Sequence, residues 1–405
     1  MELLHRHNCA GRRACRCAAI RSRVDSPTAQ AGNSDRLLKP VGGAECDMRM
    51  NCDDGAKLED ESMKNMRNLM RLLWAAILAC VALGQLVHAA DWVVYQGRSG
   101  PGQGKHIVFL TGDEEYRSEE GLPMLAKILA VRHGFKCTVL FAIDPADGTI
   151  KPTVLNNIPG MEALDTADLC IMKLRFRELP DAQMKHFVDY VDSGRPIIAL
   201  RTSTHAFSYE KNKQSPYAKF DWRSKEWPGG FGQQVLGETW VSHHGEHGKE
   251  STRGVINPEF KNHPILRGVT DVWGPTDVYT VVHLPKDAQV LMHGQVLSGM
   301  NPTDPPVQGK KNDPMMPLVW TRSYTGSKGK SSFVFTTTMG ASVDLESEGL
   351  RRLLVNAAYY ATGMADKIPE SNDVRYVGEY KPTWFGFGKF KPGVKPSDLE
   401  LKASE

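Results

Sequence analysis

The alternation of short apolar strands with amphipathic helices is the feature that most constrains this chain. HIVFLTG at 106–112 is rich in β-branched and aromatic residues, which is typical of a strand buried on both faces. A helix is predicted to follow, with Ser118 as its N-cap and Gly134 at its end. Repeated units of this kind predict a three-layer α/β fold, in which helices cover both faces of a mostly parallel sheet.

The same alternation continues along most of the chain. Further strands are predicted at 137–142, 168–174, 196–200, 278–283, 288–293, 316–324 and 332–338. A second helix is expected between Pro180 and Gly194, and a last helix rich in Leu and Ala ends at Gly363. The periodicity fades at 202–262, which predicts a functional insertion within a domain that spans 105–363.

A different pattern precedes this domain. Within residues 63–90, three basic residues stand before an uncharged apolar run, and small residues follow it. These are the parts of a secretory signal peptide, so we expect cleavage near Ala89 and export to the periplasm or the extracellular space. The apolar run at 72–83 is too short to cross a bilayer, and no transmembrane segment is expected in the mature protein. Lipidation at Cys80 is an alternative.

Residues 1–62 are rich in Arg, Cys and Asp and lack periodicity. Because a signal peptide begins at the initiator methionine, we expect translation to start at Met63 and residues 1–62 to be untranslated or disordered. The cysteine spacings there do not match common zinc modules. Residues 91–405 hold 37 basic and 37 acidic side chains, and this balance gives no electrostatic footprint for nucleic acid.

Two further segments flank the domain. Residues 91–104 are predicted to be a linker, because the glycines at 97–104 precede the first strand of the alternation, whereas a phosphate-binding loop would follow it. Residues 364–405 are predicted to form an extended C-terminal arm. The aromatic residues of its WFGFGKF motif (384–390) are expected to pack on the domain surface, and a separate binding module is the alternative.

Polar side chains follow three of the predicted parallel strands. Ligands bind at the carboxyl ends of such strands, where loops and helix N-termini converge. The polar residues at these positions are Asp113, Glu114, Glu115, Tyr116, Arg117, Lys173, Arg175, Arg177, Arg201, Thr202, Ser203, Thr204 and His205. Carboxylates, guanidinium groups and hydroxyls can bind a polyhydroxylated ligand or a small anion. A solvated rim of salt bridges is the alternative.

The segment 240–250, WVSHHGEHGKE, holds the densest group of histidines. The metal ligands predicted from it are His243, His244 and His247. With a carboxylate from elsewhere, such as Asp113 or Asp277, two of them would bind zinc or another divalent metal, which would support hydrolysis or isomerisation. Otherwise the histidines line the cleft or pair with carboxylates. The candidates to stack on a sugar are Trp222, Trp227 and Trp240, with aromatic packing of the insertion as the alternative.

Several motifs resemble the ThuA-like (trehalose utilisation) family. They are LPDAQMKHFVDYVDSGRPIIALRTSTHAF at 179–207, NHPILRGVTDVWGPTDVY at 262–279, PLVWTRSY at 317–324 and FVFTTTMG at 333–340. The resemblance covers 105–363 and implies a flavodoxin-like, class I glutamine amidotransferase-like fold. It also implies a role in carbohydrate utilisation, a sugar or sugar-derived ligand, and a sugar oxidoreductase of the same pathway as a candidate partner.

The residues exclude the chemistry for which that fold is best known. Amidotransferases of this fold carry a nucleophilic cysteine in the turn that corresponds to RTSTH at 201–205, which has none. Cys137 and Cys170 lie in predicted strands, so cysteine-based glutamine hydrolysis is not expected. Ser203 with His205 as base would be an alternative nucleophile, but the glycines of a hydrolase elbow are missing.

The sequence therefore predicts an exported protein of carbohydrate utilisation that binds or converts a sugar or sugar derivative. The predicted acid–base residues are His205, His244 and Glu114. The predicted substrate-binding residues are Asp113, Arg117, Arg175, Arg177, Arg201, Thr202 and Ser203. Two classes stay open: a sugar hydrolase or isomerase, with or without a metal, and a non-catalytic carbohydrate-binding or complex-forming protein on a degenerate amidotransferase fold.

Overall fold

The computed structural model describes residues 63–74 and 90–402. Residues 63–74 form one exposed helix in a unit of their own. Within the described residues, no helix is long and apolar enough to cross a membrane. The predicted cleavage site and the segment 1–62 lie outside the described residues.

A single sheet of ten strands runs through the described part of the second unit. In chain order the strands are β1 (Trp92–Tyr95), β2 (His106–Gly112), β3 (Lys136–Leu140), β4 (Leu169–Leu174), β5 (Ile197–Leu200), β6 (Ser251–Ile256), β7 (Trp273–Gly274), β8 (Gln289–Leu297), β9 (Met316–Thr325) and β10 (Ser331–Thr337). Across the sheet the order is β1-β3-β2-β4-β5-β10-β9-β8-β6-β7.

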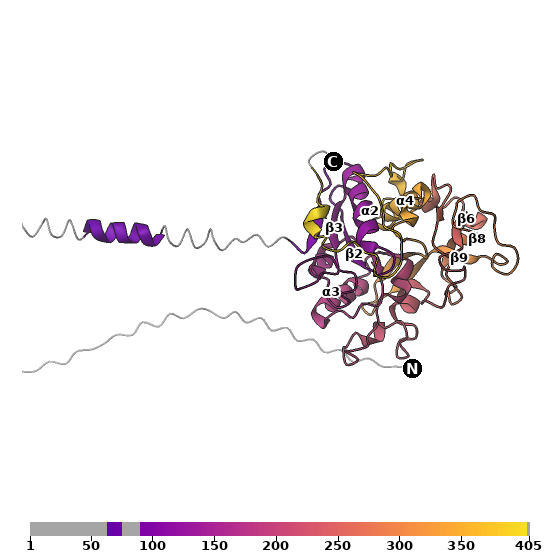
Figure 1. The fold of residues 1–405 in the computed structure, drawn as a ribbon, viewed down its shortest axis with the longest axis horizontal. Coiled ribbons are helices and arrows are strands. Elements are labelled where there is room, and N and C mark those ends of the chain that lie inside the picture. Colours follow the sequence, from indigo (N-terminus) through magenta and orange to yellow (C-terminus); the bar gives the residue numbers. More distant parts are fainter. Residues whose placement is uncertain (1–62, 75–89, 403–405) are drawn as a thin grey trace, which may run out of the picture. The chain divides into compact units, whose positions relative to one another are not determined.

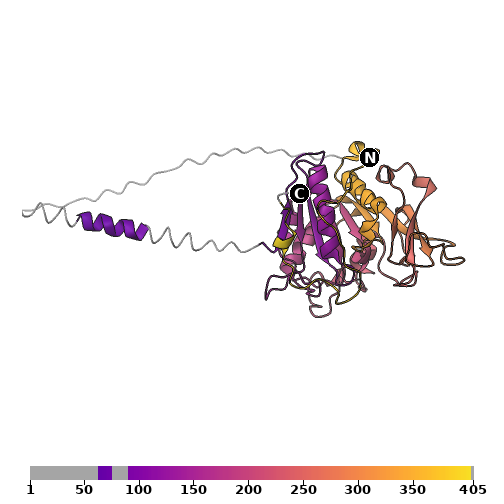
Figure 2. The ribbon, with the colours of Figure 1, turned by 45° about the horizontal axis from the view of Figure 1, so that its top comes forward.

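The five central strands, β3-β2-β4-β5-β10, are all parallel. This part of the sheet confirms the predicted α/β fold with a mostly parallel central sheet. Counted in chain order these strands run 2-1-3-4-5, the order of doubly wound, flavodoxin-like sheets. Antiparallel strands extend both edges, with β1 on one side and β9, β8, β6 and β7 on the other. Figures 1 and 2 show β6, β8 and β9 at the far end of the sheet from β3.

Helices cover both faces of the sheet because successive strand residues point in opposite directions. Ile107 and Phe109 pack in one core with α2 (Ser118–His133) and α4 (Glu348–Ala361). Val108 and Leu110 pack in the other core with α3 (Asp181–Asp192). Figure 1 shows α2 and α4 on one side of β2 and β3, and α3 on the other. The central sheet is thus buried on both faces.

The start of α2 differs from the prediction. Ser118 is the first residue of the helix and not its cap, because Arg117 precedes it in a left-handed conformation with φ 55°. The Ser118 hydroxyl instead accepts hydrogen bonds from the backbone N–H groups of Gly112 and Asp113, at 2.9 and 3.1 Å. This side chain therefore ties the end of β2 to the start of α2. Gly134 ends the helix as predicted.

The secondary structure of three other segments also differs from the prediction. The predicted linker contains β1, which pairs with β3. The segment 278–283 is irregular, and only Tyr279 makes an isolated bridge, with His243. The predicted insertion at 202–262 contains β6, which did not form an apolar run in the sequence because it includes Gly254 and three polar residues. Each of these segments is short or mixed in polarity, so its periodic signal is weak.

The C-terminal arm lies along the domain. The Tyr380 hydroxyl donates to the Ser342 carbonyl at 2.7 Å, and the Tyr95 hydroxyl donates to the Leu399 carbonyl at 2.8 Å. The Glu120 carboxylate in α2 accepts hydrogen bonds from the backbone and the hydroxyl of Thr383. Polar contacts along its length therefore fix the course of the arm over α2.

We expect Phe109→Ala to lower the free energy of unfolding by about 3–5 kcal/mol, because the ring is fully buried between β2 and its helices. Urea unfolding of the purified protein measures this loss. The matched control is Val94→Ala on β1, where the side chain is 44% exposed and the change should stay within about 0.5 kcal/mol. Equal losses in the two variants would contradict this assignment of the core.

Candidate functional site

The candidate site lies where the sheet changes its direction of winding. β3 and β4 flank β2 on opposite sides, so the loops after β2 and β4 diverge, and the turn after β5 lies beside them. The Asp113 carboxylate is fully buried among these loops. It accepts hydrogen bonds from the N–H groups of Glu115 and Tyr116, at 2.8 and 3.0 Å, and from the Thr202 hydroxyl at 2.6 Å. Asp113 and Thr202, both predicted to bind substrate, thus join two loops.

Three of the four predicted substrate-binding arginines, Arg117, Arg177 and Arg201, are also fully buried. Arg177 donates to backbone carbonyls at 152, 154 and 175 and pairs with Glu114 at 2.8 Å. Arg117 donates to the carbonyl of Gly386 in the arm. The guanidinium groups of Arg117 and Arg177 therefore hold the loops and the arm together, and neither side chain lines the cavity at these strand ends.

Glu114, predicted as an acid–base group, lies between two guanidinium groups. Its two carboxylate oxygens pair with Arg175 and Arg177 respectively. Burial raises the pKa of Glu114, and the charges of Arg177 and Arg175 oppose that rise. This carboxylate is a bridge between two strand-end loops.

The turn after β5, Arg201–His205, directs its side chains inward. The Ser203 hydroxyl donates to the Met172 carbonyl in β4 at 3.1 Å, so it is not placed as a nucleophile. His205 is buried among aromatic rings, with ring centroids 5.1 Å from Phe176 and 5.5 Å from Trp240. Burial, reinforced by nearby positive charges, holds the pKa of His205 well below its usual range. Its imidazole is therefore neutral at physiological pH.

A buried ion pair between Arg201 and Asp277 lies at the centre of the site. Arg201 Nη2 is 3.0 Å from Asp277 Oδ1, and Nη1 donates to the carbonyls of Asp277 and Thr338. The rings of Tyr116 and Tyr279 lie against the guanidinium group, with centroids 4.1 and 4.4 Å from Cζ. Arg201, predicted to bind substrate, is thus enclosed by protein.

Two histidines converge on the same carboxylate. His243 Nδ1 is 2.6 Å from Asp277 Oδ2, and His247 Nδ1 is 3.0 Å from Oδ1. The other ring nitrogen of His247, Nε2, lies 3.5 Å from Glu115 Oε1. Burial alone would raise the pKa of Asp277, but the hydrogen bonds from both histidines and the charge of Arg201 outweigh it and hold that pKa well below its usual range.

The side chain of His244 lies apart from those of His243 and His247. Its Nε2–H donates to the Lys311 carbonyl at 2.8 Å, so the side chain takes no part in the histidine cluster. The third member of the cluster is Asp277, one of the two carboxylates that the sequence analysis named as possible ligands. His243, His247 and Asp277 form the group whose ligand atoms lie within 4.8 Å of one another and that could hold a metal ion. Loop glycines beside His244 make the spacing of these histidines uninformative.

A small cavity of about 40 Å³ lies beside this cluster. It is lined by Glu115, Tyr116, Arg175, Phe176, His205, Trp240, His243 and Tyr279. Among the residues predicted to be catalytic or to bind substrate or metal, only Arg175, His205 and His243 line it. The aromatic lining residues Phe176 and Tyr279 were missed, because an aromatic residue in a loop has the same sequence signal whether it packs in a core or lines a ligand site.

The C-terminal arm borders the same place. Phe385 is buried against Tyr116 and His247, with ring centroids 5.7 and 5.4 Å apart. Its neighbours are open to solvent: Trp384 is 46% exposed and Phe387 is 61% exposed. The Phe387 ring lies 5.0 Å from the Arg175 guanidinium group. The WFGFGKF motif therefore brings the exposed ring of Phe387 beside a residue that lines the cavity, while the exposed ring of Trp384 stacks on Phe385.

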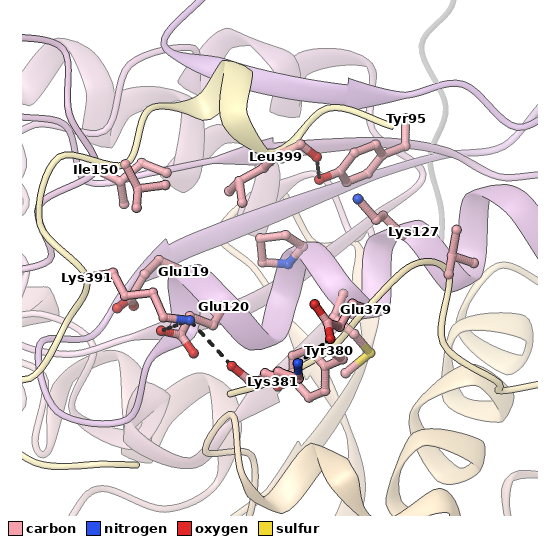
Figure 3. Close-up of a pocket in the computed structure, with 14 residues that line it drawn as sticks. Tyr95, Glu119, Glu120, Lys127, Ile150, Glu379, Tyr380, Lys381, Lys391 and Leu399 are labelled. Atoms are coloured by element: carbon pink, nitrogen blue, oxygen red, sulfur yellow. Dashed lines mark hydrogen bonds and ion pairs between the residues drawn. The ribbon is translucent and has the colours of Figure 1, made fainter. Parts of the chain in front are cut away.

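A larger cavity, of about 210 Å³, lies elsewhere, between α2 and the arm (Figure 3). Four of its charged side chains form two ion pairs, Lys391 with Glu120 and Lys381 with Glu379. None of the residues predicted for the site lines it. Glu119 in its wall is buried, and neither of its carboxylate oxygens has a hydrogen-bond partner among the described residues. We assign this cavity to the packing of the arm.

Comparisons with known proteins agree with the motifs. The family model described as trehalose utilisation, ThuA, matches residues 106–361, which confirms the resemblance inferred from the sequence. A ThuA-like protein from Bacteroides uniformis is 16% identical, with 65% of this chain and 93% of that chain covered and a TM-score of 0.40. One from Parabacteroides merdae is also 16% identical, with 64% and 90% covered and a TM-score of 0.42. No curated protein matches the chain.

The stability of the protein should depend on the protonation of Glu119. Burial raises the pKa of Glu119 to about 7, above an ordinary value of 4.5. Its contribution to stability is therefore complete below about pH 4.5 and is lost as the pH rises through 7. Between pH 5 and 8 the free energy of unfolding of the wild type should fall by up to about 3 kcal/mol more than that of Glu119→Gln.

Urea unfolding at the two pH values tests this. Glu379→Gln is the matched control, because that side chain lines the same cavity but is 73% exposed. Parallel pH profiles for the wild type and Glu119→Gln would show that the buried carboxyl titrates normally.

Proposed function

Because the chain belongs to the ThuA family of trehalose utilisation, we propose that it binds a sugar or sugar derivative beside the cavity at the ends of β2, β4 and β5. One observation carries the proposal. Two exposed aromatic rings of the arm connect to residues that line that cavity. Phe387 lies 5.0 Å from the guanidinium group of Arg175, and Trp384 stacks on Phe385, which packs on Tyr116. Exposed aromatic rings beside a charged, partly buried rim suit a ligand that has both an apolar face and hydroxyl groups.

The size of the cavity decides how such a ligand binds. About 40 Å³ has room for water molecules or for one substituent but not for a sugar ring. The ring of the sugar therefore lies outside, against Trp384 and Phe387, and a single hydroxyl or carbonyl group enters the cavity. There it meets the Glu115 carboxylate and the neutral imidazole of His205, which can accept or donate a hydrogen bond.

The positions of the cysteines and of Ser203 argue against catalysis by a cysteine or serine nucleophile. Cys137 and Cys170 are fully buried in β3 and β4, and burial raises the pKa of both thiols. Together with the inward-pointing Ser203, this supports a protein without cysteine amidotransferase or serine hydrolase activity. Conversion of the sugar, by hydrolysis or isomerisation, is the second candidate function, and the histidine pair on Asp277 favours it.

We also propose that the protein is exported and that its signal peptide is cleaved after Ala89, on the pattern of basic, apolar and small residues within 63–90. The protein recovered from the periplasm or the medium should begin at Ala90, as read by N-terminal sequencing. An exported chain that still contains Cys46 would contradict both the cleavage site and the proposed start at Met63.

Replacing the exposed aromatics should weaken sugar binding without unfolding the protein. Each of Trp384→Ala and Phe387→Ala should raise the dissociation constant by about two- to twelvefold, because a stacking contact contributes about 0.5–1.5 kcal/mol. Calorimetric titration with a panel of oxidised and unoxidised disaccharides measures the dissociation constant of each variant. The control is Val282→Ala, an equally exposed apolar side chain (58%) that does not line the cavity.

The same samples separate binding from conversion. If the protein is an enzyme, product should accumulate with at least one disaccharide and its formation should depend on His205. Binding that survives His205→Gln, with no turnover in the wild type, would leave a carbohydrate-binding protein. Affinities unchanged in both arm variants would overturn the proposed position of the sugar.

A further inference from the structure

We propose that His243, His247 and Asp277 bind one divalent metal ion of the zinc class and leave a coordination position open beside the small cavity. Two imidazoles and one carboxylate are the protein ligands of many catalytic zinc sites, in which water takes the fourth position. The metal site itself does not require the sugar, so it goes beyond the proposed function.

The ligand atoms already converge. His243 Nδ1 lies 2.6 Å from Asp277 Oδ2, and His247 Nδ1 lies 3.0 Å from Oδ1 of the same carboxylate. An ion at about 2 Å from each ligand needs these separations to open to about 3.3 Å. The two imidazoles can make this small shift, because their side chains are 37% and 35% exposed. The same exposure gives an ion a path from solvent.

The surrounding contacts are those that ligands of a metal usually have. Arg201 bonds Oδ1 of Asp277 at 3.0 Å and leaves Oδ2 available for the ion. If His247 binds through Nδ1, its Nε2–H faces Glu115 Oε1 at 3.5 Å. A carboxylate partner of this kind fixes the tautomer and orientation of a ligating histidine. Arg201 and Glu115 thus act as positioning residues for two of the three ligands.

The fourth position faces the place where a substrate group would enter. His243 and Glu115 both line the small cavity, which is large enough for a water molecule. A bound zinc-class ion would supply an activated water or polarise a carbonyl oxygen, and that chemistry rests on the proposed function. Within the described residues, His243, His247 and Asp277 are the group whose geometry could hold an ion.

Metal titration of the whole chain tests the site. Protein stripped with a chelator is titrated with Zn²⁺ by calorimetry, and a second sample is loaded with Co²⁺ and read by visible absorption. We expect one Zn²⁺ per chain and a cobalt spectrum of four-coordinate type. His243→Ala and His247→Ala should each weaken Zn²⁺ binding at least tenfold, and Glu115→Gln should weaken it less.

His244→Ala is the matched control, because this neighbouring histidine bonds the Lys311 carbonyl and should leave Zn²⁺ binding unchanged. No stoichiometric Zn²⁺ binding by the wild type would overturn the proposal, and so would equal losses in all three histidine variants. The cobalt spectrum of the wild type keeps the test valid should a variant fail to fold. Sugar binding by metal-free protein, measured in parallel, shows separately whether the proposed function holds.

Discussion

The buried ion pair between Arg201 and Asp277 is the interaction on which the rest of the site depends. It joins the turn after β5 to the irregular segment near Tyr279, and both partners are almost completely shielded from water. Such a pair contributes little net stability relative to apolar packing, but loss of one partner is costly because it leaves an uncompensated charge. Its main effect is therefore on geometry: Asp277 is held where His243 and His247 can both reach it.

Around this pair, most of the charged residues at the strand ends are used to build the site and not to bind a ligand. Asp113 joins two loops, Glu114 bridges two guanidinium groups, and Arg117 holds the arm. These charges are buried because each has an opposite charge as a partner or hydrogen bonds to backbone groups and hydroxyls. Arg175 differs from these residues, because it lines the cavity and also contacts the exposed ring of Phe387.

The sequence predicted the fold better than the site, for a physical reason. Strands such as 106–112 and helices such as 118–133 follow from local periodicity, which each segment carries by itself. Whether an arginine is buried or faces a ligand depends on distant partners: Arg177 meets carbonyls near residue 152, and Arg201 meets Asp277. For the same reason His244 could not be told from His243, since in a loop neighbouring side chains take unrelated directions.

The C-terminal arm contributes contacts to the site in addition to those of the strand-end loops. Phe385 packs on both Tyr116 and His247, and the backbone N–H of Gly386 donates to the Glu115 carbonyl at 2.8 Å. The arm therefore closes over one end of the histidine cluster while it presents Trp384 and Phe387 to solvent. Because the family model ends at residue 361, these arm contacts lie outside the part of the chain that defines the family. The strand ends thus supply the polar groups of the site, and a segment outside the family match supplies the exposed rings near them.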